Sequence, residues 1–506
     1  MERVVLEGKT KRFWRVLLAL LALAWVLTAA GPLGASESPA ATANQTAAAQ
    51  ISAADADADE TLEEDAFMQD LLNESTGGDV PAAADVDTGP TLPLSYEGEV
   101  MGSLWAPNNH DEEWHTTNRL DLKGWREFGD LSVDGRLRLD YQDLEDEDKA
   151  RANLRELYAT YQLRPGAGGY ADFSIGKKIL YWGKGDEVRP LDRICPEDLT
   201  ALYFNDLNDR KTGRVGAFVD WQANRRIRFE GFWSPYFEAG ESPELGDYYE
   251  PSKLRMLADA GIAIDGADEP DEWSSDAGFG GRLMFSVLKA DLALYGFQGY
   301  DPKPAYEVHR IGIHPLYGLP IVPQSVRETH PRMTLYGADI ERAFGSVVLR
   351  AEAAYQSDGA WFSLDWAQDP TLLLETPSGT VEKDQLQYVI GMDKQDLFIH
   401  NLFMNLQFVG TRIFDYDSRI IVPESDNGVT AYLRYSFLDS KFEVWYRYMI
   451  LFEETEQRHH CEIGYKPLPW AKVSLGAITF DGDADAYYFG QYADRDFVYT
   501  KLKLIF

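Results

Sequence analysis

Cysteines, basic residues and long apolar runs are scarce in this sequence. The chain of 506 residues has 2 cysteines, too few for a secreted scaffold held together by disulfides. It has 48 Lys and Arg against 83 Asp and Glu, a formal net charge of -35. This acidity argues against a nucleic-acid partner, because phosphates repel it. After residue 30 no apolar run is long enough for a transmembrane helix.

Residues 1–35 have the pattern of a secretory signal peptide. Basic residues precede an apolar run at 16–30, and small residues follow the run. We expect cleavage after Ala30 or Ala35; a retained membrane anchor is the alternative, because the run approaches spanning length. No Cys follows the run, which argues against a lipid-anchored N-terminus. Export leaves the periplasm, the outer membrane and the medium as destinations.

Residues 36–91 are predicted to be a disordered periplasmic tail. No Lys or Arg occurs from residue 16 to 118, and thirteen acidic residues lie between 37 and 90. Such low hydrophobicity and high charge oppose a packed core. Inside the tail, Thr61 and Glu64 have capping-box spacing and apolar residues recur at helical intervals. A short amphipathic helix at 61–73 would either dock on a partner or the barrel mouth, or form transiently in a linker.

From residue 92 to 506 the hydrophobic period is two, which predicts β-strands. Their length of about 9–11 residues matches a tilted crossing of the hydrocarbon layer. Short connections such as 164–170 and 223–224 alternate with long polar ones such as 234–277 and 356–384. The expected strands are 95–105, 114–123, 131–141, 154–163, 171–181, 214–222, 225–233, 278–288, 290–300, 332–342, 346–356, 385–394, 398–410, 428–437, 441–451, 458–467, 470–480 and 496–506.

This pattern predicts an all-β fold: a closed antiparallel transmembrane β-barrel in the outer membrane of a Gram-negative bacterium. Short turns on one side and long loops on the other are typical of such barrels, with both termini in the periplasm. The strand number must then be even. We expect 18 strands, and merging or splitting one hairpin would give 16 or 20.

The stretch 496–506 has two distinct faces and ends at Phe506. It resembles the C-terminal strand of bacterial outer-membrane barrels, which typically ends in Phe and is read by the barrel-assembly machinery. Phe506 is therefore the candidate assembly signal, and outer-membrane lipids are the expected surroundings. An ordinary edge strand is the alternative.

Charged residues fall on the strand faces opposite the apolar ones. A lipid-facing Arg or Lys at mid-depth would cost about 2–4 kcal/mol, so these side chains are expected to line the lumen. They would either brace the wall as ion pairs or select solutes. Lys177 and Lys178 break the alternation unless Gly176 marks a bulge. The lumen-lining candidates are Arg136, Arg138, Arg226, Arg228, Glu230, Arg350, Glu352, Arg434, Glu443 and Arg447.

The connection 182–213 is rich in charges of both signs, next to Trp182 and Pro190. We expect it to fold into the barrel as its narrowest element, because opposed fixed charges at a constriction select solutes. The alternative is a plug that is held by its own ion pairs. The candidate constriction residues are Lys184, Asp186, Arg189, Asp192, Arg210 and Lys211.

This loop and the strand before it contain four short motifs: Gly176 followed by Trp182-Gly183-Lys184 with Asp186-Glu187; Pro190 with Asp192; Pro196-Glu197-Asp198-Leu199; and Asp206 with Asp209-Arg210-Lys211. The loop resembles that of a poorly characterised family of proteobacterial outer-membrane barrels, more distantly similar to alginate-export barrels. Cys195 stands where that family has Asn, which puts this turn in doubt. The resemblance implies a porin or export channel and names no substrate.

Signals for catalysis, metals and cofactors are weak. Asp481, Asp483 and Asp485 begin like a calcium loop, but Ala486 and Tyr492 replace the required Gly and Glu. No Cys-x-x-Cys-His motif for haem occurs, so we expect no metal, no cofactor and no enzyme. Cys195 and Cys461 could pair, although two free thiols are the default. A channel for small or oligomeric solutes, with a possible periplasmic export partner, is the leading function. The alternative is a non-conducting scaffold or receptor barrel.

Overall fold

The computed structural model describes residues 95–107, 114–143, 149–164, 169–271, 273, 275–312 and 322–506. The expected signal peptide and the acidic tail with its 61–73 helix lie outside these residues. No helix in the described ranges is long and apolar enough to cross a membrane.

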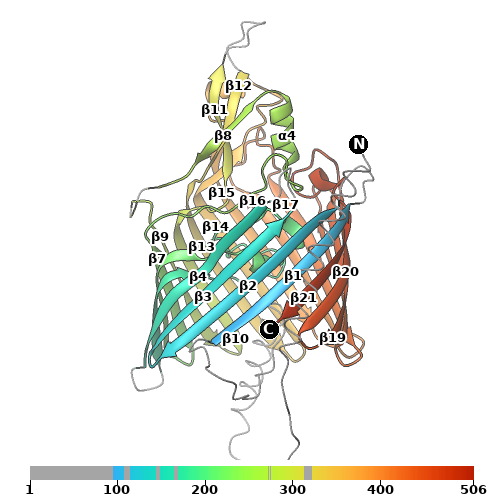
Figure 1. The fold of residues 1–506 in the computed structure, drawn as a ribbon. Helices are drawn as coiled ribbons and strands as arrows, with labels where there is room; N and C mark the ends of the chain where they lie inside the picture. Colours follow the sequence, from blue (N-terminus) through green and yellow to red (C-terminus); the bar gives the residue numbers. More distant parts are fainter. Residues whose placement is uncertain are drawn as a thin grey trace, which may run out of the picture. The chain divides into compact units, whose positions relative to one another are not determined.

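Eighteen strands form one closed antiparallel barrel (Figure 1). Each strand pairs with the next, and β1 also pairs with β21, which closes the ring. The prediction of a closed 18-stranded barrel is thus confirmed. The barrel strands are β1 (Ser95–Pro107), β2 (His115–Phe128), β3 (Leu131–Gln142), β4 (Lys149–Leu163), β5 (Tyr170–Lys178), β6 (Arg214–Asn224), β7 (Ile227–Ser234), β9 (Gly278–Val287), β10 (Ala290–Tyr300), β13 (Arg332–Phe344), β14 (Val347–Ser363), β15 (Thr380–Lys394), β16 (Leu402–Ile413), β17 (Ser425–Phe437), β18 (Phe442–Leu451), β19 (Glu456–Leu468), β20 (Ala471–Asp481) and β21 (Phe497–Ile505).

The alternation in the sequence gives the barrel an apolar outside and places charged side chains of the strands on the inside. In β3, Leu137 and Leu139 are 38% and 40% exposed on the outer face, whereas Arg138 and Asp140 are 3% and 8% exposed on the inner face. Successive side chains of a strand point to opposite faces. The face of one residue therefore determines which residues of a regular strand point outward and which point inward. The end with the short turns, such as the one between β6 and β7, is here named the turn end, and the other the loop end.

The seam between β1 and β21 closes the barrel at its turn end through Gly98 and Phe506. The N–H of Gly98 donates to the Phe506 carbonyl at 2.8 Å, and the Phe506 N–H donates to the Gly98 carbonyl at 2.9 Å. The Phe506 ring covers Gly98 so closely that a Cβ on Gly98 would lie 2.5 Å from it. A larger residue at position 98 would therefore displace the Phe506 ring.

Gly176 does not mark a bulge, so the break in alternation at Lys177 and Lys178 remains. The pairings of β5 with β4 and with β6 run through Gly176 without a shift. Gly176 instead has φ +134, and a Cβ there would lie 2.3 Å from the Leu157 carbonyl oxygen. The irregularity falls in β4, where the pairing with β3 skips Arg155. Lys177 lies near the loop end of β5 and pairs with Glu238 at 3.0 Å.

A second, three-stranded sheet was not predicted. It consists of β8 (Ala263–Asp268), β11 (Ala305–Gly312) and β12 (Val322–Thr329), with β8 parallel to β12 (Figure 1). Its small core combines Val308 and Val326 with residues from α4 (Ser252–Asp259) and α5 (Leu372–Glu375). These strands are short and contain charged residues, so their sequence pattern indicates loops rather than strands. Within the described ranges the remaining short elements are α3 (Leu207–Arg210), η1 (Leu202–Phe204) and η2 (Gly490–Tyr492).

Candidate functional site

The connection between β5 and β6, residues 179–213, is here named the inner loop because it packs on the inner faces of many strands. Its apolar anchor is formed by Trp182, Leu191 and Ile194, which are 2%, 0% and 0% exposed. They join inward-facing residues of β6, β7, β10, β13 and β14, among them Phe232 and Leu335. Burying each large apolar side chain contributes about 1.5–3 kcal/mol, so this side of the loop is firmly held.

Residues 183–191, here named the tip, are fixed by one carboxylate from the wall. The Glu352 side chain of β14, 3% exposed, accepts the backbone N–H groups of Lys184 at 2.6 Å, Gly185 at 2.9 Å and Leu191 at 2.7 Å. Gly183 has φ +82, and a Cβ there would lie 2.6 Å from a Glu352 oxygen. The glycine therefore lets the backbone approach the carboxylate.

Two acidic side chains of the tip extend to the neighbouring wall. Asp186 accepts from Arg350 at 3.0 Å, Asn405 at 2.6 Å and Gln407 at 3.0 Å, which lie on β14 and β16. Glu187 pairs with Arg447 at 3.3 Å and with Arg458 at 2.8 Å. Burial opposes the ionisation of Glu187, but the two guanidinium groups outweigh it and hold the pKa of this carboxyl below its ordinary value.

Residues 199–209, here named the limb, lead the chain to another part of the wall. Arg138 donates to the Asp209 carbonyl at 2.6 Å and lies 3.3 Å from its carboxylate. Asp206 accepts from Arg447 at 2.7 Å. Burial opposes the ionisation of Asp209, yet the surrounding arginines, Arg119 foremost, lower the pKa of this carboxyl. The limb thus joins the strand pair β2–β3 to β18.

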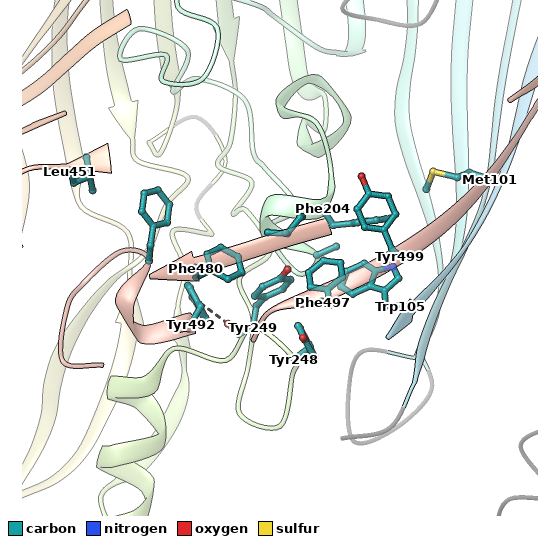
Figure 2. Packing of buried hydrophobic residues seen from close by; sticks show 13 residues of the cluster. Met101, Trp105, Phe204, Tyr248, Tyr249, Leu451, Phe480, Tyr492, Phe497 and Tyr499 are labelled. Carbon is teal, nitrogen blue, oxygen red and sulfur yellow. Dashed lines mark hydrogen bonds between the residues drawn. The ribbon is translucent and has the colours of Figure 1, made fainter. Parts of the chain in front are cut away.

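An aromatic cluster holds the middle of the limb (Figure 2). Phe204 lies 4.3 Å from Trp105 and 5.1 Å from Tyr499, measured between ring centroids. Trp105 also stacks on Phe497 at 4.5 Å. Tyr249, from the long connection after β7, is fully buried in the same cluster. The limb is therefore packed against the seam of β1 and β21.

Only part of the expected constriction set is open to water. The side chains of Asp186 and Lys184 are 43% and 32% exposed, and Arg189 is 20% exposed beside Asp192. Lys211 and Asp192 are 1% and 2% exposed and lie 3.1 Å apart, so the expectation that these two project into a passage is wrong. Burial opposes the charge on Lys211, but Asp192 and Glu197 outweigh it and raise its pKa.

The remaining predicted residues are placed as follows. Arg210 donates to the Asn205 carbonyl at 3.1 Å and lies over the Tyr203 ring, so it braces the limb. Arg226 lies in the exposed turn between β6 and β7 and does not line the wall. The expected strand 225–233 began two residues before the observed start of β7. Inward-facing strand positions, as the pairing registers place them, hold Arg136, Arg138, Arg228, Glu230, Arg350, Glu352, Arg434, Glu443 and Arg447.

Residues that hold the inner loop and were missed include Arg119, Arg155, Asn405, Gln407 and Arg458. The signal was present for Asn405 and Gln407, which are polar residues two positions apart in an expected strand. Both cysteines are free, with Cys195 buried and Cys461 exposed, so the pairing alternative is not realised. In the described ranges no group of three Asp, Glu, His or Cys side chains is arranged to hold a metal ion.

Protonation of three carboxyls of the inner loop is expected to loosen it below about pH 4. Glu187, Asp209 and Glu197 all have a lowered pKa in the docked loop, against about 3.9–4.3 for free carboxyls. Their stabilisation is complete above the free value and is lost as the pH falls through the lowered one. In a Cys461→Ser variant, the labelling rate of buried Cys195 by a pyridyl disulfide reports this opening. A rise in labelling already at pH 6 would contradict the expectation.

Comparison with known proteins gives one family and several similar solved structures. No curated protein matches the sequence. Among solved structures, OccAB3 of Acinetobacter baumannii has a TM-score of 0.45 at 8% identity, covering 82% of this chain and 99% of that one. OccK5 (OpdH) of Pseudomonas aeruginosa has a TM-score of 0.44 at 9% identity, covering 82% and 96%. The outer membrane channel DcaP of Acinetobacter baumannii has a TM-score of 0.40 at 10% identity, covering 82% and 97%.

The family model described as "Protein of unknown function (DUF1302)" matches residues 103–506. This range includes the whole inner loop and all of the barrel except the first part of β1. The likeness to alginate-export barrels expected from the loop motifs stays a prediction. The chain therefore belongs to the DUF1302 family of proteins of unknown function.

Proposed function

We propose that this protein is an outer-membrane channel that passes small or oligomeric solutes through a lumen narrowed by the inner loop. The observation that carries the proposal is the closed barrel, with an apolar outside and charged residues inside. Such a surface suits a bilayer, and charges inside a closed barrel are typical of a water-filled passage. The proposed orientation places the turn end and both termini in the periplasm, and the long loops on the exterior side of the membrane.

A scaffold or receptor barrel is the second candidate, because the inner loop has contacts around much of the wall. Its tip contacts β14 and β16, and its limb contacts β1, β3, β18 and β21. A loop held at so many points acts as a constriction if water passes beside it and as a plug if it does not.

Single-channel recording on the purified, refolded protein in a planar bilayer separates the two candidates. Discrete conductance steps are expected for a channel, and a silent bilayer would favour the scaffold. Heat-dependent migration on a denaturing gel confirms that the refolded sample is a barrel. A tag in the 364–379 connection should be labelled on intact cells, and labelling of a tag at 225–226 instead would invert the proposed orientation.

Ion selectivity is expected to depend on the two exposed charges of the tip. Fixed charge at a constriction attracts counter-ions, so Asp186→Asn should shift the reversal potential in a salt gradient toward anions. Lys184→Gln should shift it toward cations. Asp396→Asn, in the turn between β15 and β16, is the matched control and should leave the potential unchanged. Equal reversal potentials in all variants would assign the tip a bracing role only.

A further inference from the structure

A short pattern, Arg-x-Phe-Gly, occurs at two places where a barrel strand enters a tight turn. It is Arg126-Glu127-Phe128-Gly129 at the end of β2 and Arg342-Ala343-Phe344-Gly345 at the end of β13. The two glycines have φ +66 and +63, so both strands turn back through the same left-handed conformation. Both turns belong to the turn end, and the chain therefore builds one local structure there twice.

Each arginine of this pattern lies over the ring of its own phenylalanine. The Arg126 guanidinium is 4.7 Å from the Phe128 centroid, and the Arg342 guanidinium is 4.8 Å from the Phe344 centroid. Both rings are 52% exposed, and both arginines are exposed as well. A guanidinium stacked on a ring keeps its N–H edge for a further partner. The two sets of side chains are here named the Arg–Phe pairs.

Both Arg–Phe pairs face outward at the edge of the apolar barrel surface. Phe128 lies opposite Leu131, and Arg342 lies opposite Leu349. These leucines are 39% and 45% exposed on the outer face. Glu341, next to Arg342 in sequence, is 6% exposed and points inward, as the alternation of a strand requires. Each pair thus lies where the apolar outer face meets the turn end.

A second cation lies beside the Arg–Phe pair of β13. Lys394 of β15 is opposite Val347, which is itself opposite Phe344, so Lys394 shares their outer face. It donates to the Ser346 hydroxyl, a neutral partner that leaves its charge uncompensated. The equivalent position beside the pair of β2 holds Tyr161. The β13 pair should therefore attract an anion more strongly than the β2 pair.

The charge of the Arg–Phe pairs is not balanced by the protein. Among the described residues no carboxylate forms an ion pair with Arg126 or Arg342. Arg412, an outward-facing arginine at the loop end, differs because it lies 3.5 Å from the Glu424 carboxylate. A cation beside an apolar surface at the boundary of a bilayer is complementary to an anionic headgroup with acyl chains.

We propose that the two Arg–Phe pairs bind anionic phospholipids of the leaflet at the turn end. The lipid phosphate would accept from the free N–H edge of the guanidinium, and the acyl chains would lie beside the ring and the neighbouring leucine. The inference rests on the proposed membrane location and does not depend on conductance. One Arg near an anionic lipid increases binding about fivefold. Phosphatidylglycerol should exceed phosphatidylcholine by this factor at β2, and by more at β13.

Native mass spectrometry of the intact protein in detergent counts the bound lipids. Two molecules of phosphatidylglycerol should be retained at concentrations at which phosphatidylcholine is lost. Arg126→Gln should remove one of them, and Arg342→Gln with Lys394→Gln should remove the other. Arg412→Gln is the matched control, since it removes an outward-facing arginine at the opposite end, and it should retain both molecules. Heat-dependent migration on a denaturing gel confirms that each variant is a folded barrel.

Equal retention of the two lipids by the parent protein would overturn the inference. So would unchanged retention of phosphatidylglycerol in the variant with all three substitutions, or an equal loss in Arg412→Gln. Displacement of the lipid by inorganic phosphate at the same concentration would refute a lipid as the occupant. Vesicles keep the two proposals apart. A barrel that inserts without preferring phosphatidylglycerol would refute the site and leave the membrane location, whereas a barrel that does not insert would refute the location itself.

Discussion

Removing the limb of the inner loop, residues 199–209, is expected to raise the single-channel conductance several-fold. The ends of this segment already meet, because the Asp198 N–H donates to the Arg210 carbonyl at 2.8 Å. A Gly-Gly linker can therefore replace the segment without pulling on the rest of the loop. The deletion removes Phe204 and the carboxylates that bind Arg138 and Arg447, and it frees the space between β1–β3 and β18.

The anchor at Trp182, Leu191 and Ile194 remains in this variant, so the barrel and the tip should keep their positions. A matched control replaces 367–377 by the same linker, because this connection packs with the small sheet and not with the inner loop. Its conductance should equal that of the parent protein. An unchanged conductance in the limb variant would mean that ions pass elsewhere, and the limb would then only brace the seam.

The barrel could be predicted because the alternation of apolar and polar residues is visible within each strand separately. In β3, alternating Leu and Arg or Asp residues decide both the extended conformation and the face that turns inward. The long connections carry no such period. The small sheet was therefore missed, since β8 and β12 become strands by pairing with each other across some sixty residues.

The inner loop could be predicted as inward-folding, but its pairings could not. Mixed charge beside Trp182 and Pro190 indicated a folded loop. Which charges face water depends on contacts with distant strands, as Asp186 with Gln407 and Glu187 with Arg458. Asp192 and Lys211 looked equivalent to Lys184 and Asp186 in sequence, yet the anchor buries the first pair and leaves the second half-exposed.

Glu352 binds three backbone N–H groups of the tip, so Glu352→Ala is expected to turn a steady conductance into a rapidly fluctuating one. The substitution leaves three backbone N–H groups without the carboxylate that they share. Hydrogen bonds to charged groups contribute about 1.5–3 kcal/mol each. Even if water replaces most of this, a net loss of about 3 kcal/mol raises the ratio of open to closed tip roughly a hundredfold.

Glu456 offers a matched control for this variant. Its carboxylate, 1% exposed, also accepts three backbone N–H groups, those of Tyr488, Phe489 and Gly490 in the connection between β20 and β21. Glu456→Ala should loosen that connection to a comparable degree, since the same number of hydrogen bonds is lost. Open-channel noise should then rise more in Glu352→Ala than in Glu456→Ala, whose connection touches the inner loop where Phe489 lies 5.4 Å from the Tyr203 ring, while protease sensitivity rises in both. Equal noise in the two variants would mean that general loosening of loops, and not release of the tip, modulates the current.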